Sequence, residues 1–205
     1  MSESSLSDKK RGGDKRERIL DAAVRVFAQS GFHATRVSEV AKAAGVADGT
    51  IYLYFKSKDE LLVSLFEDRV EKLLAYLADE LPKLEGAPER LRRILELQLG
   101  FLEGERDLAE VMTVILRQST KLLKQYAAPK FLAYLDAIAH VVSEGQAAGV
   151  FRKDLSPHLV ARATFGAMDG VAITWALGKA DEGGLSKTTG QLAELFLRGL
   201  APDDE

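Results

Sequence analysis

Residues 44–61 read AGVADGTIYLYFKSKDEL, and this stretch places the tightest constraint on how the chain folds. Gly45 separates two short segments with helical apolar spacing, because glycine permits a backbone conformation that other residues resist. Tyr52 and Tyr54 then follow too closely to share the buried face of one helix. The stretch therefore predicts a helix, a tight turn and a second helix that exposes aromatic side chains.

The rest of the chain also shows helical spacing, and few stretches alternate with period two. The chain has 205 residues, of which 46% are hydrophobic, enough for a core of ordinary size. We predict an all-α protein of about nine helices. We divide it into a flexible basic tail at 1–13, a helix-turn-helix DNA-binding domain at 14–60, and a ligand-binding and dimerisation domain at 61–205.

Capping residues and helix breakers predict where the helices begin and end. The first is expected from Asp14 to about Gly31, and Thr35 is the expected N-cap of the second, which ends at Gly45. The third is expected from Asp48 to about Tyr54. The later ones are a long helix capped by Ser57 and ended near Pro82, and helices at about 89–102, 106–126, 128–148, 156–177 and 186–199.

Several classes of protein are excluded by what the sequence lacks. It has no cysteine, so disulfides, thiol catalysis and cysteine-zinc sites are impossible. His33, His140 and His158 do not have the spacing of a helical metal site, and no nucleophile or nucleotide-binding motif is present. The sequence contains no uninterrupted run of about 18 apolar residues, which is the length that a membrane-spanning helix needs. We therefore expect a cytoplasmic protein that is not an enzyme and has no metal, cofactor or membrane partner.

The two short helices and their turn predict a helix-turn-helix, which places its second helix in the DNA major groove. Short residues let the backbone approach DNA, and hydroxyl and ammonium groups reach the phosphates on either side. Asp48 is either the N-cap of the third helix or an acceptor for a cytosine amino group, and Arg36 is either a DNA contact or a solvated charge. The predicted DNA contacts are Thr35, Arg36, Val37, Ala47, Asp48, Gly49, Thr50, Tyr52, Leu53, Tyr54, Lys56 and Lys58.

A longer pattern surrounds this motif over about residues 14–62. It runs Phe27…Gly31-Phe32…Thr35…Val40-Ala41…Ala44-Gly45-Val46…Gly49-Thr50-Ile51-Tyr52-Leu53-Tyr54-Phe55…Lys58…Leu61. It resembles the DNA-binding domain of the TetR family of bacterial regulators, although Asp48 and Leu53 depart from the commonest family pattern. The resemblance implies a homodimer joined through its last two helices, double-stranded operator DNA as a partner, and a small-molecule effector that weakens DNA binding.

The stretch at 106–135 joins an apolar run to a cationic one. A pocket with an oily end and a basic end suits an amphiphilic anion such as acyl-coenzyme A. The predicted ligand contacts are the apolar Phe66, Leu97, Phe101, Met112, Ile115, Phe131, Leu135, Phe165 and Trp175, the cationic Arg106, Arg117, Lys121 and Lys124, which would neutralise phosphates, and the polar Gln118 and Asp169. The alternatives are an ordinary core for the apolar residues, a solvated helix face for the cations, and, for the two polar residues, hydrogen bonding to each other or to a backbone group.

Part of the region 105–178 is similar to one branch of the family. The residues are Leu116-Arg117-Gln118-Ser119, Tyr126, Phe131, Tyr134-Leu135, Gly145, Gly149, Phe151-Arg152, Leu155, Phe165-Gly166-Ala167-Met168-Asp169 and Trp175. They resemble the acyl-CoA-responsive repressors of fatty-acid degradation, which implies a repressor released from a pseudo-palindromic operator by a long-chain acyl-CoA. The alternatives are a TetR-type repressor of an efflux pump that senses lipophilic drugs, and a helical enzyme with a CoA ligand.

Overall fold

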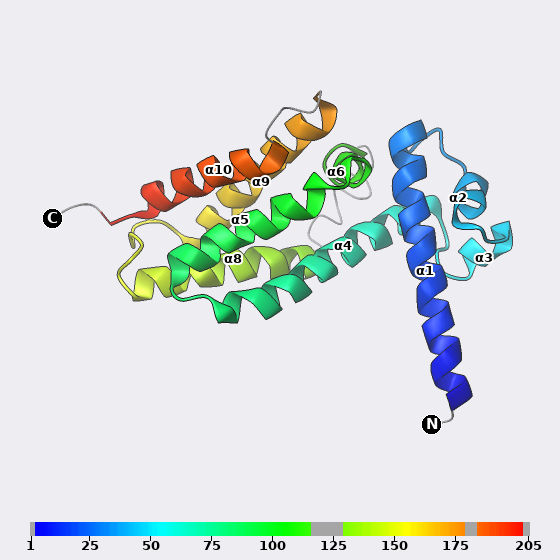
Figure 1. Ribbon diagram of the computed structural model, residues 1–205, viewed down its shortest axis with the longest axis horizontal. Helices are drawn as coiled ribbons and strands as arrows, with labels where there is room; N and C mark the ends of the chain where they lie inside the picture. The colour runs from blue at the N-terminus through cyan, green and yellow to red at the C-terminus, as the bar shows by residue number, and fades with distance from the viewer. Residues whose placement is uncertain (1–2, 116–128, 179–183, 203–205) are drawn as a thin grey trace. The chain divides into compact units, whose positions relative to one another are not determined.

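The computed structural model describes residues 3–115, 129–178 and 184–202 (Figure 1). These residues form nine α-helices, one short 3-10 helix and no strand, which confirms the all-α prediction. None of the helices in these ranges combines the length and hydropathy that crossing a membrane requires. The chain divides into two compact units. We call them the head unit, which runs up to Phe66 and includes the described residues from Glu110 to Ile115, and the bundle unit, which holds Glu67–Ala109 and the described residues from Pro129 onward.

The head unit contains α1 (Glu3–Ser30), α2 (Val37–Ala44), α3 (Asp48–Tyr52) and the first turns of α4 (Lys58–Glu80). Helix α1 packs against α2, and α2 packs against α3. Most apolar positions that give the helical spacing are buried at 1% exposure or less, whereas Val26 and Val37 are half-buried. The fully buried ones include Ile19, Leu20, Ala23, Phe27, Val40, Ala41, Ile51, Phe55, Leu61, Leu62 and Leu65. A small apolar core therefore fixes α1, α2 and α3 against the start of α4.

Helix α1 begins at Glu3, so the predicted start at Asp14 is wrong, and residues 3–13, predicted as a flexible tail, continue the helix. Extending an existing helix adds one hydrogen bond per residue without a new nucleation step. The stretch contains mostly residues with acceptable helix propensity, and Gly12 and Gly13 are its unfavourable members, at about 1 kcal/mol each. The border between the two units lies between Phe66 and Glu67, inside the continuous helix α4. The domain boundary at residue 60 remains a prediction.

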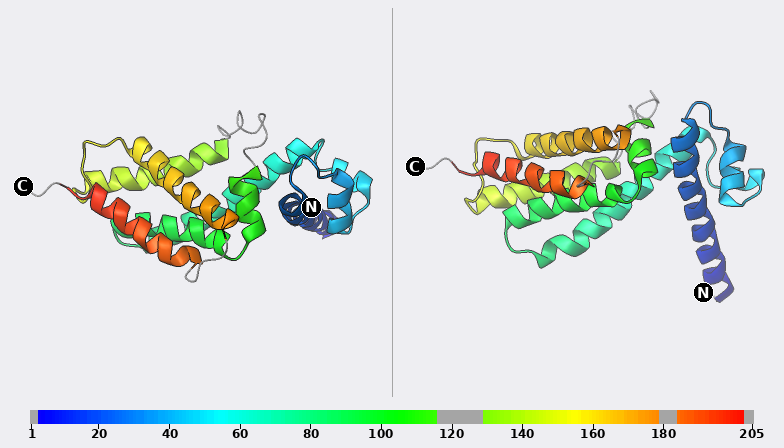
Figure 2. Two further views of the ribbon diagram at one scale, coloured as in Figure 1. Left: turned by 90° about the horizontal axis from the view of Figure 1, so that it is seen from above. Right: turned by 45° about the horizontal axis from the view of Figure 1, so that its top comes forward.

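The bundle unit contains the rest of α4, the 3-10 helix η1 (Leu81–Lys83), α5 (Ala87–Glu103), the start of α6 (Arg106–Thr113), α8 (Pro129–Ala147), α9 (Pro157–Leu177) and α10 (Gly184–Leu200). Helix α8 packs along α9, α10 packs along α5, and α5 also contacts α8 and α9 (Figure 2). In α5 the buried residues Leu91, Ile94, Leu95, Leu99 and Leu102 recur every three or four positions, which directs one face into this core.

The predicted proline and glycine helix breakers lie between helices or at their ends. Pro82 lies in η1, and Gly86, with a φ of 80°, precedes α5, which carries Pro88 in its first turn. Gly149, with a φ of 74°, follows α8. Ser156 is the N-cap of α9 as predicted, although its hydroxyl makes no capping hydrogen bond. Helix α6 ends at Thr113, so the single helix predicted from 106 to about 126 is wrong at its described end. Residues 116–128, including the break expected at 127–128, lie outside the described residues.

Candidate nucleic-acid interface and ligand site

The turn between α2 and α3 is fixed by Gly45. Its φ of 65° and ψ of 39° place it in the left-handed region that favours glycine. The Gly45 N–H donates to the carbonyl of Lys42 at 3.2 Å, and the Val46 N–H donates to that of Ala41 at 3.0 Å. These two bonds satisfy carbonyls at the end of α2 and set the direction in which the chain enters α3.

Helix α3 presents one apolar side inward and its aromatic row outward. Ile51 and Phe55 are each 1% exposed, whereas Tyr52 is 57% and Leu53 82% exposed, and Tyr54 is half-buried. This confirms that the closely spaced aromatic residues do not belong to the core. Tyr52 therefore lies on an accessible face of the head unit, beside the small residues of α3.

Two details of the predicted interface are wrong. Thr35 is only 2% exposed, and its hydroxyl donates to the Gly31 carbonyl at 2.8 Å, so it is a core residue rather than a DNA contact. The N-cap of α2 is Arg36, whose backbone N–H donates to the Glu39 carboxylate at 2.7 Å. Asp48 is not an N-cap either, because Ala47 occupies that position and Asp48 is the first residue of α3. Its carboxylate lies in the first turn, where the helix dipole favours negative charge.

The other predicted contacts remain predictions, and they lie on accessible parts of the head unit. Arg36, Ala47, Asp48, Gly49, Tyr52, Leu53 and Lys56 are exposed, and Val37, Thr50, Tyr54 and Lys58 are half-buried. The structure therefore gathers most of the predicted set on α2, α3 and the segment that leads into α4.

Lys58 makes hydrogen bonds to the backbone that the sequence did not predict. Its ammonium donates to the backbone carbonyls of Phe32 at 2.6 Å, His33 at 3.0 Å and Thr35 at 2.8 Å. It also lies 4.7 Å from the centroid of the Phe32 ring. A lysine has three N–H donors, and all three are used inside the head unit. The predicted phosphate contact assumed an available ammonium, and it remains a prediction.

Arg18 is a functional candidate that the sequence reasoning missed. Its guanidinium, on α1, donates from Nη2 to the carbonyl of Ala44 at 2.6 Å, and a longer bond of 3.4 Å reaches Gly45. It therefore caps the end of α2 beside the turn. The only sequence signal was a cation about one turn after the start of a predicted helix, which carries no information about a partner 26 residues away.

In the bundle unit, two predicted ligand walls lie together. The rings of Phe131 on α8 and Phe165 on α9 have centroids 4.9 Å apart in an edge-to-face arrangement. The Tyr134 ring lies 6.3 Å from Phe165, and its hydroxyl donates to the side-chain oxygen of Gln98 on α5. Burial raises the pKa of Tyr134, so the phenol stays neutral at any physiological pH. This aromatic cluster, with its one polar link, joins α5, α8 and α9.

Arg106 and Trp175 also lie together, but the Arg106 side chain is hydrogen-bonded to the backbone of α9. The Arg106 Nε donates to the carbonyl of Ala176 at 3.0 Å, and its Nη2 donates to that of Trp175 at 3.1 Å. The guanidinium carbon lies 5.6 Å from the Trp175 ring centroid. Arg106 thus caps the C-terminal end of α9, where a cation is favoured. The prediction that it neutralises a CoA phosphate is not supported by this geometry.

The remaining predicted ligand residues are divided between the two units. Leu97, Phe101 and Asp169 are half-buried and Leu135 is buried in the bundle unit, whereas Phe66, Met112 and Ile115 belong to the head unit. The polar set Arg117, Gln118, Lys121 and Lys124 lies outside the described residues. Within the described ranges, no three His, Asp or Glu side chains are arranged to hold a metal ion.

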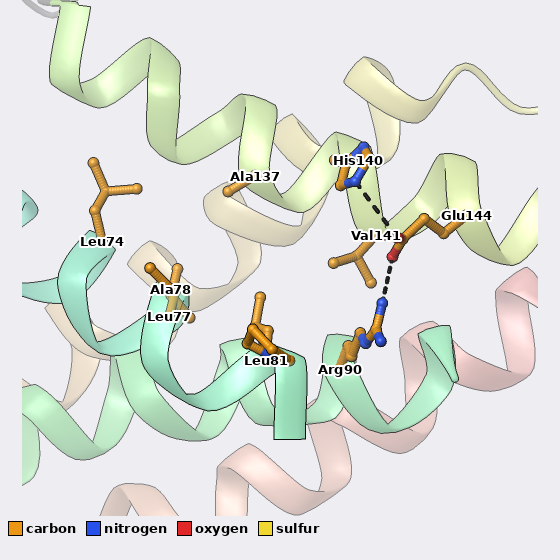
Figure 3. Close-up of a pocket in the computed structure, with 10 residues that line it drawn as sticks. Leu74, Leu77, Ala78, Leu81, Arg90, Ala137, His140, Val141 and Glu144 are labelled. Atoms are coloured by element: carbon orange, nitrogen blue, oxygen red, sulfur yellow. Dashed lines mark hydrogen bonds and ion pairs between the residues drawn. The ribbon is translucent and has the colours of Figure 1, made fainter. Parts of the chain in front are cut away.

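A pocket of about 410 Å³ lies in the bundle unit between α4, η1, α5 and α8 (Figure 3). Its lining residues are Leu74, Leu77, Ala78, Leu81, Pro82, Arg90, Ala137, His140, Val141 and Glu144. The Arg90 guanidinium donates to Glu144 at 2.9 Å, and His140 Nε2 lies 3.4 Å from the same carboxylate. None of the predicted ligand contacts lines this pocket, so it does not correspond to the site inferred from the sequence.

Comparison with known proteins identifies both parts of the chain. Residues 19–65 match the family of bacterial regulatory proteins of the tetR family, and residues 66–199 match the C-terminal region of YsiA-like proteins. The chain is 35% identical over 184 residues to the fatty acid metabolism regulator protein of Bacillus subtilis, covering 89% of this chain and 93% of that protein.

Solved structures give the same result for the fold. The regulator FadR of Bacillus subtilis, in complex with stearoyl-CoA, matches with a TM-score of 0.83 and 33% identity, over 90% of this chain and 98% of that one. FadR of Bacillus halodurans matches with a TM-score of 0.84, 33% identity and the same coverage. These relatives are transcriptional regulators and not enzymes. The chain is therefore a member of the TetR family of bacterial regulatory proteins.

Proposed function

We propose that this protein is a homodimeric transcriptional repressor that a long-chain acyl-CoA releases from a pseudo-palindromic operator, and that it controls genes of fatty-acid degradation. The observation that carries the proposal is similarity along most of the chain to a fatty acid metabolism regulator, together with a matching fold in FadR bound to stearoyl-CoA. The similarity extends through the bundle unit, where an effector would bind, and is not confined to the DNA-binding head.

The chemistry of the bundle unit agrees with an acyl chain. The cluster of Phe131, Tyr134 and Phe165 offers aromatic surface between α8 and α9. A long alkyl chain gains about 0.8 kcal/mol for each buried methylene. The phosphates of the CoA nucleotide would be met by Arg117, Lys121 and Lys124, which follow α6 in the sequence.

DNA binding is proposed for Arg36, Val37, Ala47, Asp48, Gly49, Thr50, Tyr52, Leu53, Tyr54 and Lys56. In a dimer that binds a pseudo-palindrome, the two α3 helices would enter successive major grooves about 34–36 Å apart. The dimer would form through α9 and α10, which expose Leu159, Leu177 and Leu195 at 60%, 64% and 67%. We also propose that the protein acts in the cytoplasm.

The dimer would have two states that differ in the spacing of the two α3 helices, and only one of them binds DNA. Release requires only that the effector bind the other state more tightly. A ligand with equal affinity for both states would shift nothing. A shift from 99:1 to 1:99 needs a preference of about 10⁴-fold. Acyl-CoA affinity should therefore be lower when operator DNA is present, by the same factor as DNA affinity is lowered by acyl-CoA.

Fluorescence anisotropy tests the proposal directly. The protein is bound to labelled DNA from its own upstream region and titrated with acyl-CoAs of increasing chain length, with free CoA as the control. We expect release by long-chain acyl-CoA and no release by free CoA. Tight DNA binding that no acyl-CoA disturbs would leave a repressor with a different effector and refute the acyl-CoA assignment.

Charge reversal separates this proposal from a sensor of lipophilic drugs. Arg117→Glu and Lys121→Glu should abolish induction by acyl-CoA, because the nucleotide phosphates would meet negative charge. A neutral lipophilic inducer would be unaffected by the same changes. Induction by acyl-CoA that survives both substitutions would show that these cations do not contact the effector.

A further inference from the structure

Lys58 occupies a position that is unfavourable for a cation. It is the first residue of α4, where the helix dipole places partial positive charge, and the acidic Asp59 and Glu60 in the same turn are the residues the dipole favours. The start of the helix is already capped, because the Ser57 hydroxyl accepts the Glu60 N–H at 3.1 Å. A lysine at this site therefore requires a compensating interaction.

That interaction is with the turn between α1 and α2. The carbonyls of Phe32, His33 and Thr35 converge on the Lys58 ammonium at 2.6–3.0 Å, and the Phe32 ring lies beside it. Hydrogen bonds from a charged donor are about twice as strong as neutral ones. Three of them fix the backbone immediately before α2 to the first turn of α4.

Arg18 makes the equivalent contact at the other end of α2. Its Nη2 atom binds the Ala44 carbonyl at 2.6 Å, where the helix dipole places partial negative charge. The same atom would lie 3.1 Å from a Cβ built on Gly45, so the guanidinium also packs against the turn that leads into α3. Arg18 from α1 thus binds the last residue of α2, and Lys58 from α4 binds the turn immediately before α2.

From this arrangement we propose that Arg18 and Lys58 are positioning residues for sequence-specific DNA recognition. They hold backbone carbonyls at the two ends of α2, set the direction of α2 and α3, and contact no phosphate. The inference rests on DNA binding by the family. Base contacts demand closer alignment of the recognition helix than phosphate contacts do, because only base contacts carry sequence information.

Lys56 provides a matched control two residues before Lys58. Its side chain is exposed and makes no hydrogen bond or ion pair within the part of the chain that the structure describes; only its backbone N–H is used, by Glu60 at 2.8 Å. Lys56 is therefore the cation of this segment that is available to a phosphate. A phosphate contact contributes about 0.9 to the slope of log K against log salt, whereas a positioning residue contributes nothing.

The experiment compares Lys58→Met, Arg18→Met and Lys56→Met by measuring affinity for operator and for non-specific duplex DNA over a range of salt. Lys58→Met and Arg18→Met should lower operator affinity by roughly tenfold or more, leave non-specific affinity nearly unchanged, and keep the salt slope of the wild type. Lys56→Met should lower both affinities and reduce the slope by about 0.9. Wild-type protein that binds no operator would instead refute the repressor function itself.

A reduced slope in Lys58→Met would identify a phosphate contact and overturn the inference, as would unchanged operator affinity in both positioning variants. Thermal unfolding shows whether each variant is folded at the assay temperature. If Lys58→Met is not folded, Lys58→Arg decides the question. A guanidinium is too broad to bind three convergent carbonyls, but it binds phosphate well. If Lys58 is a positioning residue, Lys58→Arg should lose operator affinity. If Lys58 contacts a phosphate, Lys58→Arg should keep it.

Discussion

The ring of Phe151 occupies the space that a side chain at Gly145 would need. Gly145 is buried in the last turn of α8, and a Cβ placed on it would overlap the Phe151 ring. Phe151 is 2% exposed, and its N–H donates to the Gly145 carbonyl at 3.1 Å. The chain thus folds back over the end of α8 and packs its aromatic ring against the helix backbone.

Gly145→Ala should therefore destabilise the protein by about 1–3 kcal/mol, as overpacking of a buried site does. Urea unfolding measures the change. Gly100→Ala on α5 is the control, because that glycine is exposed and a Cβ there would meet nothing within 4 Å. The control should be neutral or stabilising by up to about 1 kcal/mol. Equal effects of the two substitutions would show that Phe151 moves aside freely.

Tyr52→Phe tests the exposed aromatic row of α3. Removing one neutral hydrogen bond to a phosphate should weaken DNA binding by about 0.5–1.5 kcal/mol. Operator and non-specific DNA should be affected alike, and the salt slope should not change, because no charge is lost. Tyr76→Phe on α4 is the matched control, with a side chain 56% exposed in the bundle unit. Unchanged affinity of Tyr52→Phe would remove its hydroxyl from the interface.

Leu195→Asp tests the proposed dimer. Leu195 on α10 is 67% exposed. In a symmetric interface each of the two subunits would place its new carboxylate against the apolar surface of the other. We expect monomers in sedimentation velocity and loss of operator binding, since a single head occupies only one half-site. Leu132→Asp, on α8 and 44% exposed, should remain dimeric. A Leu195→Asp protein that sediments as a dimer would place the interface elsewhere.

Glu103→Gln tests a link that depends on pH. The Glu103 carboxylate accepts the Ser186 hydroxyl at 2.6 Å and the Ser186 N–H at 3.1 Å, and these bonds lower the pKa of Glu103. Because the folded-state pKa is lowered, the stabilisation is complete above the ordinary glutamate value of about 4.3 and is lost as the pH falls below it.

The melting temperature of Glu103→Gln should consequently be lower than that of the wild type at pH 7, and the difference should shrink as the pH falls from about 5 toward 3. Glu105→Gln is the control, since the Glu105 side chain is exposed at the same corner of the chain. A difference that stays constant over this range would mean that the charge of Glu103 does not contribute.

The sequence predicted the helices and the exposed face of α3 because both follow from local spacing. Ile51 and Phe55 are buried and Tyr52 is exposed, as the helical spacing of α3 and the turn that follows it requires. The fates of Lys58 and Arg106 were not predictable in the same way. Lys58 binds carbonyls 23 to 26 residues earlier, and Arg106 binds carbonyls 69 and 70 residues later. Apolar periodicity carries no information about a polar contact between a side chain and a distant backbone.

The corner between α5 and α6 has a practical consequence for engineering. Arg106 donates a hydrogen bond to the last turn of α9, and Glu103 accepts one from the first turn of α10. Both helices are therefore held near their connection by side chains that do not belong to it. A short flexible insertion between α9 and α10 should be accepted with little loss of stability, which urea unfolding would measure.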